Sequence, residues 1–412
     1  MAQDVPRLVG KLHRQHFREL VAPTIRVLGS FAAAEDAAQE AFVEALRSWP
    51  RDGVPEAPLA WLRRVTRNRA LDRYRKRARW AEKSEVLTRE AEVELDSAFD
   101  REAVEDDVLR LVFTCCHPSL APETQIALTL RTVCGLTSDE VARAFLVATP
   151  TLQQRLVRAR RKLDRAGVPY EVPDREALPG RLEAVLRTIY LVFNEGYDAT
   201  RGDRLVRGEL CEEAIRLTRW LGVTLPERSE PLALLALMLL HHSRREARVN
   251  GEGELVRLEE QRRELWDRSA IEEALPLVEL SLKARPPSPY AIEAAIAALH
   301  AQAESAEGTD WPQIAALYTA LERASGASPV VALNAAVARA LAGDLDEGLR
   351  RLDALEAEGK LARYHLLPAA RADLLARAGR HDEARKAYQK ALSIVGNDVE
   401  RRFLERRMEA LD

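Results

Sequence analysis

One amphipathic stripe near the N-terminus limits this chain to a helical fold. Within residues 33–49, AAEDAAQEAFVEALRSW, apolar side chains recur at steps of three and four residues through four turns. The stripe consists of Ala34, Ala37, Ala38, Ala41, Phe42, Ala45, Leu46 and Trp49. Similar spacing recurs along the rest of the chain, whereas the strict alternation that indicates strands is absent. We therefore predict an all-α fold.

A chain of 412 residues is too long for one ordinary core, so two or three domains are expected. The longest apolar run, PLALLALMLL at 231–240, is about half of what a membrane span needs, so we expect a cytoplasmic protein without a membrane partner. Composition and proline content divide the chain into a helical domain at 1–80, an acidic linker at 81–104, a second helical domain at 105–168, a linker at 169–180 and a helical repeat domain at 181–412.

Charge is distributed very unevenly over the first 165 residues. Residues 61–80 hold nine Arg or Lys against one acid, although the whole chain has a net charge of −3. Residues 82–107 hold eleven acids against three bases, and residues 151–165 hold six bases against one acid. This alternation indicates two anion-binding modules joined by an acidic tether, and nucleic acid is the obvious polyanion.

The second basic segment follows a pattern typical of a helix-turn-helix. Thr137 and Glu140 have the spacing of a capping box, which predicts a helix start near Ser138. Thr149 followed by Pro150 predicts a second start, with Pro150 in the first helical position. The second helix should bury Leu152, Leu156, Ala159 and Leu163, and it should expose Gln153, Gln154, Arg155, Arg158, Arg160 and Arg161. Gln and Arg make bidentate contacts to base edges, although a merely solvated basic helix is the alternative.

Cysteine and histidine support a weaker, alternative interpretation. Cys115, Cys116 and His117 are consecutive, and with Cys134 they suggest a metal or redox site, but the spacing matches no zinc pattern and we favour structural cysteines. His241 and His242 have no further spaced ligand, so no metal and no cofactor are expected.

The C-terminal part contains an internal repeat. Residues 341–355 and 377–392 align with Gly343 and Gly379 in register, and residues 310–321 fit about one period earlier. A period near 34 residues with paired helices is typical of tetratricopeptide (TPR) repeats, whose concave surface binds a peptide or a partner domain. We expect less regular helices at 181–300 to extend the array.

The first modules resemble a known family. AEDAAQEAFVEALRSW (34–49) followed by AWLRRVTRNRALDRYRKRAR (60–79) resembles regions 2.1 to 2.4 of bacterial extracytoplasmic-function (ECF) sigma factors of the sigma-70 family. LTSDEVARAFLVATPTLQQRLVRARRKL (136–163) is similar to their region 4, although Leu146 stands where the family usually has glycine. LVFTCCHPSLAP (111–122) and IYLVFNEGY (189–197) resemble a subgroup with a long TPR-like extension.

The resemblance implies a role for each of three residue sets. The first helix face, which alone could be a merely solvated surface, would bind core RNA polymerase through Asp36, Gln39, Glu40 and Glu44. The basic helix and the loop before it would bind the minus-ten element through Arg51, Trp61, Arg63, Arg64, Arg67, Asn68, Arg73 and Arg75. The second helix of the helix-turn-helix would read the minus-thirty-five element through Gln153, Gln154, Arg155 and Arg158.

Asn68 has two interpretations. The resemblance places it beside a flipped non-template base of the minus-ten element. Its three-residue steps from Val65 and to Leu71 border the apolar stripe, so a buried structural Asn stays open.

The predicted function is therefore that of a sigma factor, a subunit without enzymatic activity that gives core RNA polymerase its promoter choice. The repeat domain would regulate it, through a protein partner or through a contact with the sigma domains. A stand-alone helix-turn-helix regulator with a TPR sensor domain is the alternative. An enzyme with a site at Cys115, Cys116 and His117 is a third class.

Overall fold

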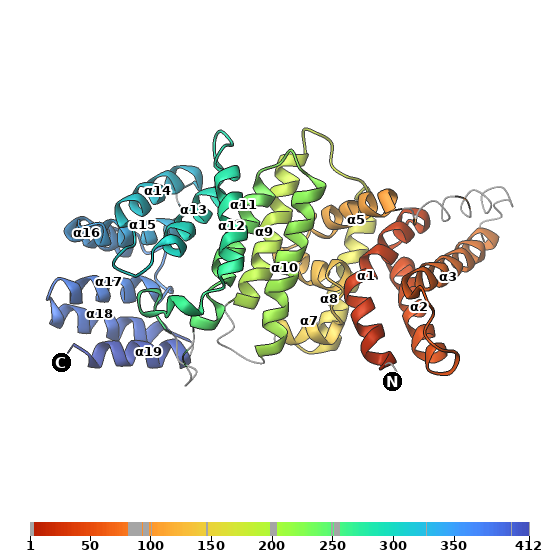
Figure 1. Ribbon diagram of the computed structural model, residues 1–412, viewed down its shortest axis with the longest axis horizontal. Coiled ribbons are helices and arrows are strands. Elements are labelled where there is room, and N and C mark those ends of the chain that lie inside the picture. The colour runs from red at the N-terminus through yellow and green to blue at the C-terminus, as the bar shows by residue number, and fades with distance from the viewer. Residues whose placement is uncertain are drawn as a thin grey trace. The chain divides into compact units, whose positions relative to one another are not determined.

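The computed structural model describes residues 4–80, 93, 99, 101–145, 147–197, 204–248, 250, 256–326, 328–396 and 398–411. All regular elements within these ranges are helices, which confirms the all-α class (Figure 1). The chain forms two compact units, Met1–Glu195 and Gly196–Asp412. Most of the predicted acidic linker lies outside the described residues, and so does Leu146.

The first unit contains eight α-helices and one π-helical turn among its described residues. They are α1 (Val5–Leu28), α2 (Phe31–Asp52), α3 (Pro58–Trp80), α5 (Arg101–Cys115), α6 (Pro122–Leu128), η1 (Thr129–Val133), α7 (Ser138–Ala144), α8 (Thr149–Arg165) and α9 (Leu178–Tyr197), whose last two residues belong to the second unit.

Local capping residues set the boundaries of the first helices. The Asp4 carboxylate accepts a hydrogen bond from the Arg7 N–H and begins α1, which ends at Gly29 with a left-handed φ of 60°. The Ser30 hydroxyl accepts from the Ala33 N–H and begins α2. The three helices α1, α2 and α3 then pack against one another, as Figure 1 shows, and α5 packs against α1. Residues of the first and second predicted modules therefore share one compact unit.

The described residues of the second unit form α-helices and three 3₁₀ turns. Its described elements are α10 (Arg204–Thr224), α11 (Glu230–His242), the 3₁₀ turns η2 (Arg245–Ala247), η3 (Leu258–Glu260) and η4 (Arg263–Leu265), α12 (Arg268–Ser281), α13 (Pro289–Gln302), α14 (Trp311–Ala324), α15 (Pro329–Leu341), α16 (Leu345–Glu358), α17 (Leu366–Arg377), α18 (His381–Ile394) and α19 (Asp398–Glu409).

The predicted repeat is visible in the helix starts. Helices α14, α16 and α18 begin at residues 311, 345 and 381, in steps of 34 and 36 residues. Gly343 and Gly379 both have positive φ, 107° and 72°, which explains glycine at the turn before α16 and α18. Helices α13 and α14, α15 and α16, and α17 and α18 form packed pairs. Residues 256–266, expected to be helical, instead form an extended segment with two 3₁₀ turns.

Candidate nucleic-acid interface

The outer face of α2 carries the four residues predicted to bind polymerase. Asp36 and Glu40 are exposed and Gln39 and Glu44 are half-buried, while the alanine face packs inward. Leu46, a member of the apolar stripe, is 44% exposed, whereas Ala45 and Trp49 beside it are buried.

Two of these carboxylates contact the basic helix α3 directly. Glu40 accepts two hydrogen bonds from the Arg73 guanidinium, at 2.7 and 3.2 Å, and this contact lowers the pKa of Glu40. Arg69 lies 3.6 Å from Glu40 and 3.8 Å from Glu44. The acidic face of α2 and the basic face of α3 therefore meet along one edge, where ion pairs partly neutralise both.

The structure places the predicted minus-ten residues on α3 and on the end of α2. Leu62, Thr66, Ala70 and Leu71 form the buried face of α3. Arg51, Arg64 and Asn68 are exposed, and Trp61, Arg63, Arg67, Arg73 and Arg75 are half-buried. Exposure of Asn68 rules out the buried structural role, and leaves its amide available to a ligand.

Two tryptophans stand at the entry to α3. Trp49 is buried at the end of α2, and its ring packs edge-on against half-buried Trp61 with 5.4 Å between centroids. The Trp49 Nε1–H is buried without a hydrogen-bond partner among the described residues, and so is the Thr66 hydroxyl. Arg63 pairs with Glu19 of α1 at 3.4 Å. The aromatic pair thus joins the end of α2 to the first turn of α3.

The helix-turn-helix forms as the sequence predicts. The Thr137 N–H donates to the Glu140 carboxylate and the Glu140 N–H donates to the Thr137 hydroxyl, which completes the capping box. Helix α8 begins one residue earlier than expected, because the Ala148 carbonyl accepts its first hydrogen bonds and Pro150 is the second residue. The Thr149 hydroxyl instead donates to Asp139 of α7 at 2.7 Å and braces the two helices.

Helix α8 presents the residues predicted to read DNA. Leu152, Leu156, Ala159 and Leu163 are all buried, as predicted. Gln153, Gln154 and Arg158 are exposed. Arg155 lies 3.7 Å from the exposed Glu123 carboxylate. Leu146, in the turn before α8, lies outside the described residues.

Arg160 departs from the prediction that it is exposed. Its guanidinium lies 2.5 Å from the carboxylate of Glu35, which is 3% exposed on α2. The Thr132 hydroxyl also donates to Glu35, at 2.9 Å. Sequence reasoning missed Glu35, although its position between Ala34 and Ala38 puts it on the inward face of α2.

The same junction contains a half-buried histidine of α1. The His13 ring lies 3.0 Å, through Nδ1, from the Gly135 carbonyl oxygen, and it stacks on Phe17 with 4.5 Å between centroids. Burial, and next the charge of Arg131, lower the pKa of His13 to about 4. A Cβ on Gly135 would lie only 3.0 Å from the His13 carbonyl oxygen, so α1 contacts bare backbone at this point.

The cysteines lie in apolar surroundings. Cys115 and Cys116 are fully buried and unbridged, and burial raises the pKa of the Cys116 thiol to about 11, which suppresses thiolate chemistry. His117 instead pairs with the Ser119 hydroxyl at 2.8 Å. Over the part of the chain that is described, no three His, Cys, Asp or Glu side chains are grouped to hold a metal.

His241 and His242 have cationic neighbours that oppose a metal. His241 Nδ1 lies 2.8 Å from the Arg244 guanidinium, and burial followed by Arg244 lowers the pKa of His241 to about 3. None of the helices within the described ranges is both long enough and apolar enough to cross a bilayer.

Comparisons with known families divide the chain into four matched segments. Residues 12–80 match Sigma-70 region 2, and residues 110–163 match Sigma-70, region 4. Residues 181–282 match a family of unknown function, DUF6596, and residues 268–412 match a tetratricopeptide repeat-like domain.

Among individual proteins, one relative matches nearly the whole chain and two named sigma factors match part of it. The chain is 42% identical to the uncharacterized protein R00370 of Rhizobium meliloti, over 94% of this chain and 92% of that protein. It is 31% identical to the RNA polymerase sigma-H factor of Pseudomonas aeruginosa, over 38% of this chain and 84% of that protein. With the ECF RNA polymerase sigma factor SigG of Mycobacterium tuberculosis it shares 29% identity over 49% of this chain and 60% of that protein. No solved structure matches the chain at the same level of significance.

Proposed function

The chain belongs to the sigma-70 family, in its extracytoplasmic-function group with a C-terminal tetratricopeptide-like domain, and from this premise we propose that it binds core RNA polymerase, recognises both promoter elements and promotes DNA opening. The observation that carries the proposal is the order of surfaces in the first unit: an acidic helix face, a basic helix beside it, and a helix-turn-helix with exposed Gln and Arg. A helix-turn-helix regulator that binds DNA without polymerase needs neither the acidic helix face nor the basic helix beside it. With these partners the protein would work in the cytoplasm.

Polymerase binding is assigned to the outer face of α2. Asp36 is exposed and pairs with no cation among the described residues, so its charge is available to a basic partner surface, whereas Glu40 and Glu44 are partly neutralised by Arg73 and Arg69. We therefore expect Asp36 and Gln39 to make the first contacts. Release of Arg73 from Glu40 would then free a guanidinium for DNA.

DNA opening is assigned to α3. Several of its half-buried arginines are held by carboxylates, Arg63 by Glu19 of α1 and Arg69 and Arg73 by acids of α2. Contact of about five arginines with phosphates would make promoter affinity fall steeply with salt, by roughly 0.9 log units per contact for each log unit of salt. Asn68 is exposed among them and would contact an unpaired base.

Reading of the minus-thirty-five element is assigned to the first turns of α8. Gln153, Gln154 and Arg158 are exposed there, and Arg155 pairs with an exposed carboxylate. Bidentate Arg and Gln contacts to guanine and adenine discriminate by about 1–3 kcal/mol each. Arg155→Ala should therefore relax promoter choice, whereas Arg64→Ala should weaken binding more evenly across sequences.

The repeat domain would regulate the sigma regions, and the structure sharpens the deletion that tests this. Helix α9 is bound to the first unit: the Arg181 guanidinium donates to the Phe113 carbonyl at 2.8 Å, and the Thr188 hydroxyl donates to Gln125 at 3.2 Å. A chain ending after residue 195 therefore keeps the first unit complete. Unchanged reporter activity of that truncated chain would remove the regulatory role.

The experiment that tests the proposal measures binding of the full chain to purified core polymerase. Asp36→Lys should weaken this binding by about tenfold or more, because it places a cation where the proposal needs an anion. Glu176→Lys, an exposed acid in the same unit, is the matched control and should bind normally. A chain that binds promoter duplex by itself and does not bind core polymerase would instead be a stand-alone regulator.

A further inference from the structure

The segment 256–266 crosses several helices of the repeat domain. It contacts α13 through Arg263, whose guanidinium donates to the Ala303 carbonyl just after that helix, at 2.8 Å. It contacts α17 through Arg257 and Glu259. Helices α13, α15 and α17 each begin a packed pair, so the segment lies along equivalent helices of successive repeats. We call these residues the strap.

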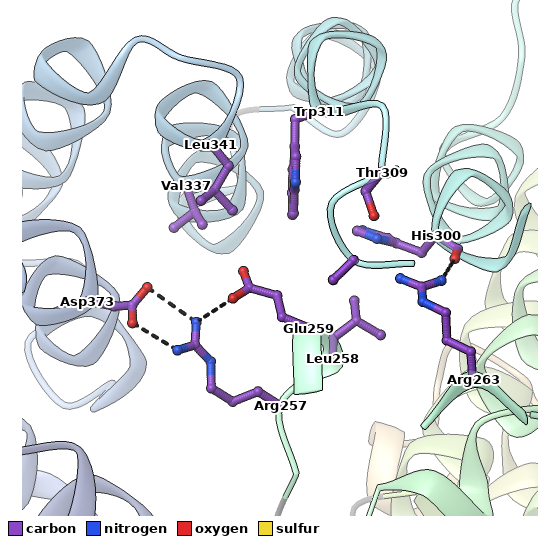
Figure 2. A pocket seen from close by; sticks show the side chains of 11 residues that line it. Arg257, Leu258, Glu259, Arg263, His300, Thr309, Trp311, Val337, Leu341 and Asp373 are labelled. Carbon is purple, nitrogen blue, oxygen red and sulfur yellow. Dashed lines mark hydrogen bonds and ion pairs between the residues drawn. The ribbon is translucent and has the colours of Figure 1, made fainter. Parts of the chain in front are cut away.

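Charge holds one end of the strap. Arg257 donates to both oxygens of Asp373, at 3.1 and 3.3 Å, and Glu259 accepts from Arg377 at 2.8 Å, as Figure 2 shows in part. Arg407 of α19 also donates to Asp373, at 2.7 Å. The groove thus offers a carboxylate for a basic residue and a guanidinium for an acidic residue two positions later.

These contacts are weak enough to exchange. Arg257, Glu259 and Asp373 keep between a fifth and a third of their side-chain surface in solvent. Ion pairs of that exposure contribute little net stability. Asp373 keeps Arg377 and Arg407 if the strap leaves, so removal of Arg257 strands no buried charge.

Between the two anchored ends the strap fits poorly. Leu258 faces a cavity of about 270 Å³, which Trp311, Val337 and Leu341 line from the opposite side (Figure 2). All four side chains are only half-buried. A larger apolar side chain at the position of Leu258 would fill space that the strap leaves empty, and filling a cavity improves binding.

We propose that the strap is an intramolecular occupant of a peptide-binding groove, and that the groove's partner is an extended protein segment with Arg, a bulky aromatic residue and Glu in succession. The partner repeats the two ion pairs and fills the cavity, so it displaces the strap despite the strap's covalent advantage. That advantage is of the order of millimolar effective concentration, so the partner displaces the strap once its concentration, multiplied by its gain in affinity over the strap, exceeds this value. The inference depends on the second unit alone and stands whether or not the first unit binds polymerase.

The test uses the full chain and fluorescent peptides of residues 256–266, followed by anisotropy. One peptide has the native sequence, one carries Leu258→Phe, and one has the residues at positions 257 and 259 exchanged. The strap is weakened in the protein by Arg257→Ala with Glu259→Ala. Asp373→Asn on that background removes the groove's carboxylate, and Asp353→Asn, which touches Arg371 away from the strap, is the matched control.

The strap-weakened protein should bind the native peptide about tenfold more tightly than the wild-type chain does, because its groove is open. The Leu258→Phe peptide should bind about tenfold more tightly again. The charge-exchanged peptide and the Asp373→Asn protein should lose binding, and Asp353→Asn should not. Equal affinity of the wild-type and strap-weakened chains for the native peptide would overturn the proposal. So would the absence of binding to either chain when thermal melts show that both are folded. Tight binding of the charge-exchanged peptide would also overturn it.

Discussion

The carboxylate of Glu35 lies within an alanine-rich helix face and depends on partners about a hundred residues away. Thr132 donates a hydrogen bond to it and Arg160 forms an ion pair with it. A buried ion pair contributes little net stability as a pair, but removal of one partner leaves an uncompensated charge. Substitution of Arg160 should therefore destabilise the protein more than substitution of the surface arginines around it.

Arg160→Ala should lower the free energy of unfolding of the first unit by about 3–5 kcal/mol. Arg161→Ala, the next residue on α8, should change it by less than about 0.5 kcal/mol because Arg161 is exposed. Urea titrations of the two variants measure the difference. Equal stabilities would show that the Glu35 carboxylate is not buried in solution.

His13 predicts a pH dependence at the same junction. Its pKa in the folded chain, about 4, lies below the ordinary 6.5, so the unfolded chain binds the extra proton first as pH falls. The stability from neutral His13 is therefore complete above pH 6.5 and is lost progressively between pH 6.5 and 4. Its size is on the order of 3 kcal/mol.

Thermal melts between pH 7 and 4.5 should therefore fall more steeply for the wild-type chain than for His13→Gln. Glutamine retains a donor toward the Gly135 carbonyl and does not titrate. His381→Gln, an exposed histidine of α18, is the control and should leave the slope of the wild type unchanged. Identical slopes for all three chains would contradict the lowered pKa of His13.

At the scale of elements, the pairing of α15 with α16 depends on a missing side chain. A Cβ on Gly348 would lie 2.5 Å from the Cβ of Ala340 and 2.8 Å from the Ala336 carbonyl oxygen. Gly348→Ala should thus force the helices apart and destabilise the second unit by about 1–3 kcal/mol. Gly208→Ala in α10 meets no atom and should instead stabilise by about 0.5–1 kcal/mol. Calorimetry measures the change in stability of each variant relative to the wild type. Two changes of the same sign would contradict this packing.

The helices themselves could be predicted from the sequence because their signals are local. The capping box at Thr137 and the stripe at Leu152 need only neighbouring residues, and both formed as predicted. The long contacts could not be predicted in this way. Whether Arg160 faces solvent or Glu35 depends on a helix 125 residues earlier, and every arginine of α8 looks alike from its own surroundings.

The candidate site could likewise be predicted only where the signals are local. Periodicity predicts which residues lie on the outer surface of the acidic and the basic helix, so the sequence alone places Asp36 on a helix surface. Periodicity does not show that Arg73 is paired with Glu40, nor that residues 256–266 leave the helical pattern to cross the repeats. Periodicity also did not distinguish a buried from an exposed position for Asn68. All three depend on tertiary contacts between side chains.

At the scale of the molecule, the first unit is too compact for the promoter geometry that the proposed function requires. Elements centred near minus ten and minus thirty-five are about 85 Å apart along straight DNA, at about 3.4 Å per base pair. Helices α2 and α8 touch through Glu35 and Arg160, and α3 is only about 35 Å long. The contact between the two sigma regions must therefore open when both elements are bound.

Labels at Asp72→Cys on α3 and Arg165→Cys on α8 should report that opening as a loss of energy transfer when core polymerase and promoter DNA are added. The four native cysteines are buried, so labelling at the two exposed positions is selective. Polymerase with DNA lacking the minus-thirty-five element is the control. Unchanged transfer with active complexes would mean that the two regions bind the promoter while still packed together.

Run-off transcription from the DNA upstream of this protein's own gene tests the central claim most directly. Core polymerase alone should give no defined transcript. Addition of the full chain should give one start site, Asp36→Lys should reduce this transcript by about tenfold or more at limiting protein concentration, and Glu176→Lys should leave it intact. A chain that binds this DNA without polymerase and yields no transcript from it would contradict the account.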